Sequence, residues 1–102
     1  MIHVVATIEL VAGKREAFLA EFRKLVPLVR SEAGCIDYGP TVDVASGIAA
    51  QIPMRDNVVT VVEKWESLRA LQAHVQAAHM ADYRTRVKDL VAGVKLQVLQ
   101  PV

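Results

Sequence analysis

The chain has 102 residues, a formal net charge of +1, and 53% hydrophobic against 23% charged residues. This balance is typical of one globular domain with one core, which we expect to span residues 1–102. The near-neutral charge provides no basic surface for nucleic acid or an anionic membrane. No apolar run is long enough to span a bilayer, and we expect no signal peptide. Cys35 is the only cysteine, so an internal disulfide is excluded and a reduced, cytoplasmic setting is expected.

The first third of the chain predicts a strand followed by a helix. Apolar and polar residues alternate over residues 2–10, which is the pattern of a half-buried strand. An apolar stripe at helical spacing then predicts a helix from about Lys14 to Glu32. Pro27 should kink this helix, and Gly34 should end it.

The middle of the chain predicts two strands joined by a less regular segment. Residues 35–44 should form a strand, and Pro40 makes it an edge strand because proline has no N–H to donate. Residues 45–57 carry turn signals, and we expect part of them to extend a long hairpin. The β-branched run at 58–65 predicts the third strand. One face of the second strand should carry Ile36, Tyr38, Val42 and Val44.

The last third predicts a helical region and a final strand. Ser67 is a good N-cap for a helix whose apolar spacing resumes at Met80 and continues to Val91, before Gly93. Alternation after Gly93 predicts the last strand. The order β-α-β-β-α-β is that of an α+β, ferredoxin-like sandwich, with one sheet and two helices on one of its faces.

The third strand is apolar on both faces. Val59, Val61 and Trp65 share one face, whereas Val58 and Val62 share the other. Two helices cover only one face of a sheet, so a second copy of the chain is the simplest cover for the other. We therefore expect a homodimer. The alternative is a partly solvent-exposed sheet face that tolerates a few valines.

Three stretches of the sequence stand out together: Gly13-Lys14, residues 30–38 (RSEAGCIDY) and residues 63–67 (EKWES), the last followed by His74 and His79. They resemble the antibiotic biosynthesis monooxygenase family of small, dimeric α/β-barrel proteins. The resemblance covers nearly the whole chain. It implies quinol monooxygenases or polyketide-tailoring oxygenases, which need no metal or flavin. The haem-degrading branch has an asparagine in the first strand, where this chain has Ala6-Thr7, so haem is not expected either.

The two neighbouring histidines are a poor metal pair by sequence. His74 and His79 are five residues apart, which is about 140° of rotation on an ideal helix. Side chains so related do not share a face, unlike the i, i+4 pair of zinc proteases. No cysteine or carboxylate cluster compensates, so we expect no metal site.

His79 is the first candidate for a catalytic base. It follows Ala77-Ala78, where the resembling family often has a break in the helix, and at a break it could point into a pocket and titrate near neutral pH. The alternative is a structural histidine bonded to a backbone carbonyl. For His74 we favour a structural role, pairing with Glu66 or a helix end, over a catalytic one.

Glu63 is the second candidate base. By period two it shares a strand face with valines and Trp65, where desolvation would raise its pKa. An equally good interpretation is a salt bridge to a basic side chain. The candidates for that partner are Arg84, Arg86 and Lys95.

Three further residues are candidates for substrate binding. Trp65 could form an aromatic wall for a flat ligand, although a core role is commoner. Tyr38 could hydrogen-bond a phenolic group or lie at a rim, and His3 could line an interior or lie on the surface.

The sequence supports three hypotheses for function. The first is a cofactor-independent monooxygenase in which a quinol or hydroxy-aromatic substrate is deprotonated in an apolar pocket and then reduces O₂. The second is an isomerase or other proton-transfer enzyme using the same histidines, and the third is a non-catalytic dimeric ligand-binding protein. Oxygen uptake, isomerisation without oxygen uptake, or binding without product would distinguish them.

Overall fold

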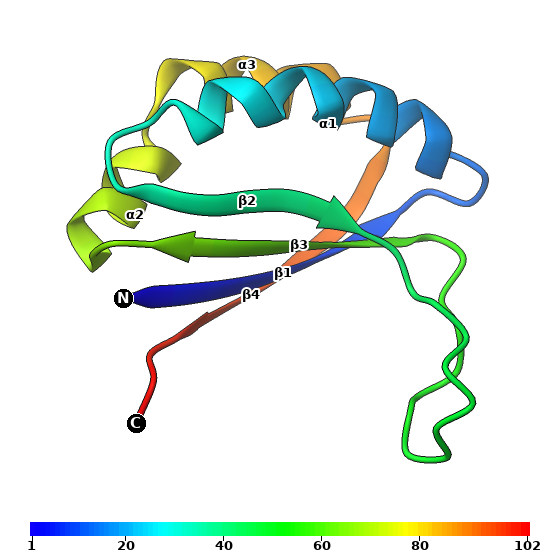
Figure 1. Cartoon of the computed structure of the whole chain (residues 1–102). Coiled ribbons are helices and arrows are strands. Elements are labelled where there is room, and N and C mark those ends of the chain that lie inside the picture. Colours follow the sequence, from blue (N-terminus) through cyan, green and yellow to red (C-terminus); the bar gives the residue numbers. More distant parts are fainter.

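A computed structural model describes all residues 1–102 and contains one antiparallel sheet with helices on one face (Figure 1). The strands lie in the order β2-β3-β1-β4, which confirms the ferredoxin-like arrangement. The predicted second helix is divided into two. The strands are β1 (Ile2–Leu10), β2 (Cys35–Thr41), β3 (Val58–Trp65) and β4 (Val91–Leu99). The helices are α1 (Arg15–Arg30), α2 (Leu68–Val75) and α3 (Ala78–Val87).

The core lies between the sheet and the helices, as the alternation in β1 and β3 predicts. In β1 the even-numbered side chains from Val4 to Leu10 are buried, and in β3 the odd-numbered ones from Val59 to Trp65 are buried. The two central strands pair in register, with Ala6 opposite Val61. The apolar stripe of α1 packs on this surface through Phe18, Phe22, Leu25 and Val29.

The strand β2 is an edge strand, as Pro40 predicts, but two of its details differ from expectation. It ends at Thr41 rather than at residue 44. The register with β3 shifts between Cys35 and Asp37, where two residues of β2 advance against one of β3. This bulge turns Ile36 outward, with 48% of its surface exposed, while Tyr38 is 2% exposed. The prediction that Ile36 and Tyr38 share a face is therefore wrong.

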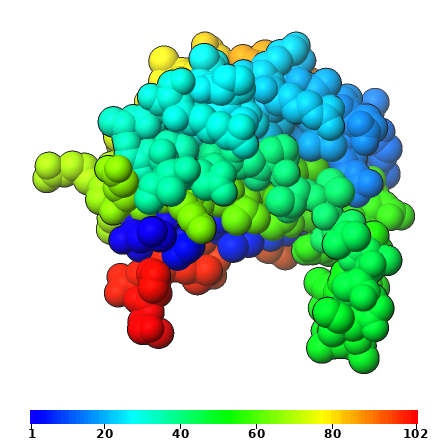
Figure 2. All heavy atoms as spheres, viewed as in Figure 1, coloured from blue at the N-terminus to red at the C-terminus, as the bar shows by residue number.

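Residues 42–57 form an arm that extends beyond the body of the molecule on the side of the sheet away from the helices (Figures 1 and 2). They contain no strand, so the predicted hairpin extension is wrong. The base of the arm is closed by Arg55, whose Nε and Nη2 donate to the two carboxylate oxygens of Asp43 at 2.9 and 2.8 Å. Apolar side chains are exposed along the arm: Val42, Val44, Ile48, Ile52 and Met54.

The chain leaves the helical layer earlier than its apolar spacing predicts. The helix α3 ends at Val87, and a turn in which Leu90 N donates to Val87 O at 2.8 Å leads directly into β4. Val91 is therefore the first residue of a strand and not part of the helix. Val91 belongs to the sheet, where it pairs with Leu10 of β1. No helix is both long and apolar enough to cross a membrane.

We predict that replacing Gly34 with alanine destabilises the fold more than replacing Gly13. Both glycines have positive φ, 83° and 79°, so an alanine at either is strained by about 1–2 kcal/mol. At Gly34 the new Cβ would also lie 2.6 Å from the Cβ of Ala70, whereas at Gly13 it meets nothing within 4 Å. The clash should add about 1–3 kcal/mol, measured by urea unfolding. Equal losses for both variants would show that α2 does not pack closely on this turn.

Candidate active site

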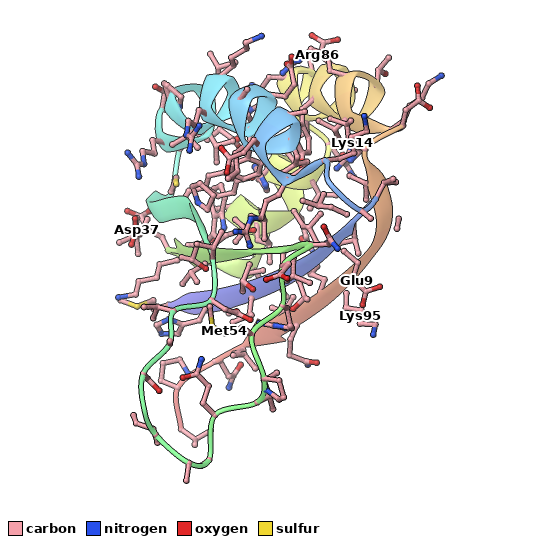
Figure 3. All side chains as sticks on the ribbon, turned by 90° about the vertical axis from the view of Figure 1, so that its right-hand side faces the viewer. Glu9, Lys14, Asp37, Met54, Arg86 and Lys95 are labelled. Atoms are coloured by element: carbon pink, nitrogen blue, oxygen red, sulfur yellow. The ribbon has the colours of Figure 1, made fainter.

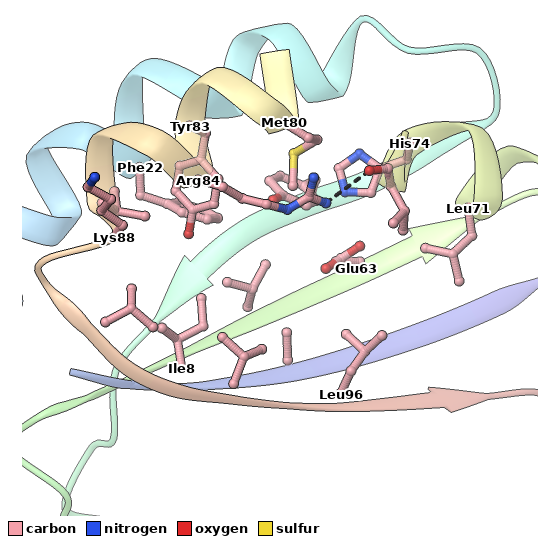
Figure 4. Close-up of a pocket in the computed structure, with 17 residues that line it drawn as sticks. Ile8, Phe22, Glu63, Leu71, His74, Met80, Tyr83, Arg84, Lys88 and Leu96 are labelled. Atoms are coloured by element: carbon pink, nitrogen blue, oxygen red, sulfur yellow. Dashed lines mark hydrogen bonds between the residues drawn. The ribbon is translucent and has the colours of Figure 1, made fainter. Parts of the chain in front are cut away.

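An apolar cavity of about 490 Å³ lies between the helical layer and the sheet (Figure 4). Thirteen of its 17 lining residues are hydrophobic. Its floor comes from the inward faces of β1, β3 and β4, and its roof from α2 and α3. The inward residues of β4, Val94 and Leu96, remain more than half exposed, since little of the helical layer covers this edge strand. The polar lining residues, apart from the tyrosines, are Glu63, His74, Arg84 and Lys88.

His74 lies in the last turn of α2, and three side chains hold its ring in place. It is 3% exposed. The indole of Trp65 lies against it with ring centroids 4.7 Å apart, and the ring of Tyr38 meets it edge-on at 5.4 Å. The Nδ1 atom lies 2.9 Å from Oε2 of Glu32. Because a carboxylate can only accept, Nδ1 donates, and the other ring nitrogen, Nε2, is left as a proton acceptor in the neutral ring.

Glu32 also binds the second histidine. The Nε2 atom of His79 donates to the same Oε2 atom at 2.7 Å, so one carboxylate oxygen accepts from two imidazoles. Glu32 belongs to the turn after α1, where its N–H donates to Val29 O at 2.9 Å and its carbonyl accepts from Cys35 N at 3.2 Å. The turn thus fixes the carboxylate within hydrogen-bonding distance of one side chain from α2 and one from α3. His74 pairs with Glu32, and the expected pairing with Glu66 is wrong.

The break between α2 and α3 is what brings the histidines together. Gln76 and Ala77 separate the helices, so the 140° rotation expected for a continuous helix does not apply. The break precedes Ala78 rather than following it. Arg84 fastens the junction, because its Nη2 donates to Val75 O, a free carbonyl at the end of α2, at 2.9 Å.

The convergence of these side chains also forms a set of atoms that could bind a metal ion. One ligand atom each from Glu32, His74 and His79 lies within 4.8 Å of the others. A set of two histidines and one carboxylate suits a transition metal. The geometric reason for expecting no metal pair is therefore wrong, although the two hydrogen bonds to Glu32 already occupy the three facing atoms, Nδ1 of His74, Nε2 of His79 and Oε2 of Glu32. The expectation that no metal takes part stays a prediction.

Glu63 lies in the cavity floor and is 5% exposed. Its Oε1 accepts from Nε1 of Trp65 at 2.9 Å, and it forms no salt bridge. The three basic residues expected as partners bind elsewhere: Arg84 to Val75 O, Arg86 to Glu21 and Lys95 to Glu9. Burial raises the pKa of the Glu63 carboxyl above its ordinary value, although the hydrogen bond from Trp65 and the nearby His74 lower it.

Two tyrosines complete the polar part of the lining. Tyr38 is buried against Phe22, whose ring stacks on it at 5.6 Å, so it lies in the cavity wall and not at a rim. Tyr83 meets the same phenylalanine edge-on at 5.6 Å. Burial raises the pKa of both phenols well above the ordinary value, so both hydroxyls remain protonated and available as donors.

Three expected site residues do not line the cavity. Trp65 is fully buried behind His74 and Glu63, where it supports both side chains and forms no wall for a ligand. His79 is directed at Glu32 and is not part of the lining. His3 lies on the opposite face of the sheet, since it alternates with the buried Val4.

The model of the antibiotic biosynthesis monooxygenase family matches residues 1–86. The chain belongs to this family. It is 41% identical to "Probable quinol monooxygenase YgiN" of Escherichia coli K12 over 103 aligned positions, covering 99% of this chain and 98% of the relative.

The family fold is seen in solved structures of similar proteins. A protein from Pseudomonas aeruginosa aligns with a TM-score of 0.80 and 27% identity, over 99% of this chain and 93% of that one. One from Shewanella oneidensis aligns with a TM-score of 0.77 and 31% identity, over 96% and 87%. The family resemblance drawn from the sequence is confirmed.

Sequence reasoning did not single out Glu32 or Lys88, and it considered Arg84 only as a salt-bridge partner of Glu63. Glu32 stands in the motif that carries the family resemblance, but nothing in its spacing points to histidines more than 40 positions away. Lys88, at the C-cap of α3, follows Arg84 by four residues, and the pair could have been recognised as one face of this helical segment.

We predict that Glu63→Gln stabilises the fold at neutral pH relative to the native chain. A raised pKa means that the folded state holds the proton more tightly, so stability falls as pH rises from the ordinary value of 4.5 through the folded pKa. Glutamine lacks this loss and can still accept from Trp65. Urea unfolding across this pH range should show the advantage of the variant growing with pH and then levelling off. A stability difference between the variant and the native chain that stays constant or shrinks as pH rises would contradict the assigned burial effect.

Proposed function

We propose that this protein is a cofactor-independent monooxygenase that oxidises a quinol or hydroxy-aromatic small molecule with O₂. The observation that carries the proposal is the position of His74, a buried imidazole in the wall of an apolar cavity with its acceptor nitrogen set by Glu32. Family membership and the name of the Escherichia coli relative support it.

The overall reaction balances without a bound cofactor. A quinol and O₂ give a hydroxyquinone and water: one oxygen atom forms a bond to the ring carbon, and the other leaves as water. The substrate supplies all the electrons. The protein has to remove a hydroxyl proton, because the resulting anion reduces O₂ far more readily than the neutral quinol, and to keep bulk water away.

The chain's own residues divide this work. His74 accepts the hydroxyl proton, and Glu32 orients its ring and stabilises the imidazolium that forms. His79 is a positioning residue, since it acts through the same carboxylate and not on the substrate. Glu63, held by Trp65, is the second candidate base in the same cavity.

We predict that His74→Ala lowers kcat for a working quinol substrate by about 10²–10⁴-fold, the usual effect of removing a general base. His79→Ala should lower kcat less, because the His74–Glu32 bond remains, and His3→Ala should leave turnover unchanged, since His3 lies on the other sheet face. Oxygen consumption and product formation are measured for each variant after its melting temperature is checked. Full activity of a folded His74→Ala variant would exclude the assignment and make Glu63 the base.

The same assay is run with the native protein in the presence and in the absence of a chelator. Turnover that persists supports the cofactor-independent reaction. Turnover that disappears on chelation, and returns with one particular metal, would instead make the Glu32–His74–His79 set a metal centre. Isomerised product without oxygen uptake would favour the proton-transfer alternative.

We also propose that two copies associate through the sheet faces that the helices leave uncovered. Val62 lies on this face with 42% of its surface exposed, opposite Val5 of β1. The arm, with its exposed apolar side chains, projects on the same side of the sheet as this face (Figure 2). Exposed apolar side chains on both this sheet face and the arm favour contact with a second protein surface over water.

We predict that sedimentation shows a particle of twice the 11.2 kDa chain mass at micromolar concentration. Val62→Lys should shift it to a folded monomer, because a charge on the buried face is costly. Leu28→Lys is the matched control, since Leu28 is 50% exposed but lies on α1. A native chain that sediments only as a monomer would refute the dimer, and equal effects of both substitutions would refute this interface.

A further inference from the structure

Two basic side chains, Arg84 of α3 and Lys88 at its C-cap, line the cavity without a carboxylate partner. Arg84 and Lys88 are four residues apart, so they lie one turn apart on one helix face, where like charges repel. Arg84 donates to the backbone carbonyl of Val75 and forms no ion pair, and Lys88 forms none either. Arg86, between them, faces away from the cavity and pairs with Glu21 at 3.1 Å. The two unpaired cations are thus specific to the cavity side of α3.

The surroundings make these cations more effective than ordinary surface charges. The cavity walls are mostly apolar, and a low dielectric on one side strengthens the field of a charge at its edge. Both side chains are exposed, so an anion that arrives from solvent can reach them. An arriving anion would be favoured over a neutral molecule of the same shape.

The two ends of the cavity differ in chemistry. Figure 4 places His74 and Glu63 at one end and Lys88 in the roof at the other, with the Arg84 side chain reaching along the roof toward His74. A flat molecule whose hydroxyl meets His74 therefore presents its opposite edge to Lys88. Apolar side chains line the space between the two ends.

We propose that the substrate is a hydroxy-aromatic acid, whose carboxylate is bound by Lys88 at the end of the cavity remote from the reacting hydroxyl. This inference rests on the proposed function and names the class of substrate for the same site. Lys88 binds the carboxylate, and Arg84, whose guanidinium lies toward His74, adds positive potential along the roof. The charged end also fixes the direction in which the ring enters, with the hydroxyl toward His74.

The test compares two ligands that differ only in the carboxylate. Calorimetric titration of the intact protein under argon uses 2-naphthol and 6-hydroxy-2-naphthoate, so binding is measured without turnover. At low ionic strength the naphthoate should bind more tightly by about three- to tenfold, as expected for one partly exposed ion pair. The preference should shrink toward zero near 1 M salt, where screening acts within about 3 Å.

Variants assign the preference to one side chain. Lys88→Gln should abolish most of it, and Lys88→Glu should make the naphthoate bind more weakly than naphthol. Lys95→Gln and Arg86→Gln are matched controls, since Figure 3 shows Lys95 beside Glu9 and Arg86 on the outer side of the helical layer. Both controls should keep the native preference.

The outcomes separate this inference from the proposed function. Equal affinity for the two ligands, or a preference that survives in Lys88→Gln, would overturn the inference and leave the oxygenase proposal intact. Binding of neither ligand to the folded protein would count against the aromatic site itself, and the inference would fall with it. A preference lost in Lys88→Gln alone would support it.

Discussion

One carboxylate oxygen determines the geometry of the candidate active site. Oε2 of Glu32 accepts from His74 at 2.9 Å and from His79 at 2.7 Å, and so links the turn after α1 to both α2 and α3. A carboxylate so largely withdrawn from water is costly unless its lone pairs are used. Two imidazole donors meet that need, and in return the carboxylate sets which nitrogen of each ring carries hydrogen. The cavity wall depends on this link, because the ring of His74 has no other hydrogen-bond partner.

The sheet supplies the second constraint. Side chains alternate between the two faces of β3, so Glu63 and Trp65 lie on the same face as the valines of the core. The indole N–H of Trp65 donates to the Glu63 carboxyl, which this burial would otherwise leave without a partner. Trp65 also packs on His74 at 4.7 Å. The two candidate bases of the cavity are thus held by one buried aromatic residue. Loss of Trp65 would disturb both, which explains how a residue outside the lining can affect the site.

The sequence is enough to predict what depends on local pattern. Alternation predicts β1 and β3, Pro40 predicts the edge strand, and Ser67 caps α2 through a hydrogen bond from Ala70 N at 3.1 Å. The family resemblance also follows from local stretches. These features depend on neighbours within a few residues, so periodicity and turn chemistry are sufficient to find them.

The remaining features depend on contacts between distant residues, which spacing does not reveal. Glu32 meets histidines 42 and 47 positions away, and no periodicity relates them. The rotation argument against a shared site for His74 and His79 assumed one continuous helix, and the break removes that assumption. The bulge that turns Ile36 outward and the irregular arm at 42–57 arise from tertiary packing, which overrides the alternation of the chain.

The most direct test of this account is the tautomer of each histidine, observed by ¹⁵N NMR of the imidazole nitrogens in the native protein. The account predicts hydrogen on Nδ1 of His74 with Nε2 unprotonated, and hydrogen on Nε2 of His79. Glu32→Gln should weaken both assignments while leaving His3 unchanged. A native His74 that carries hydrogen on Nε2 and none on Nδ1 would contradict the central claim, because its acceptor nitrogen would then point at Glu32 and not be free for a substrate.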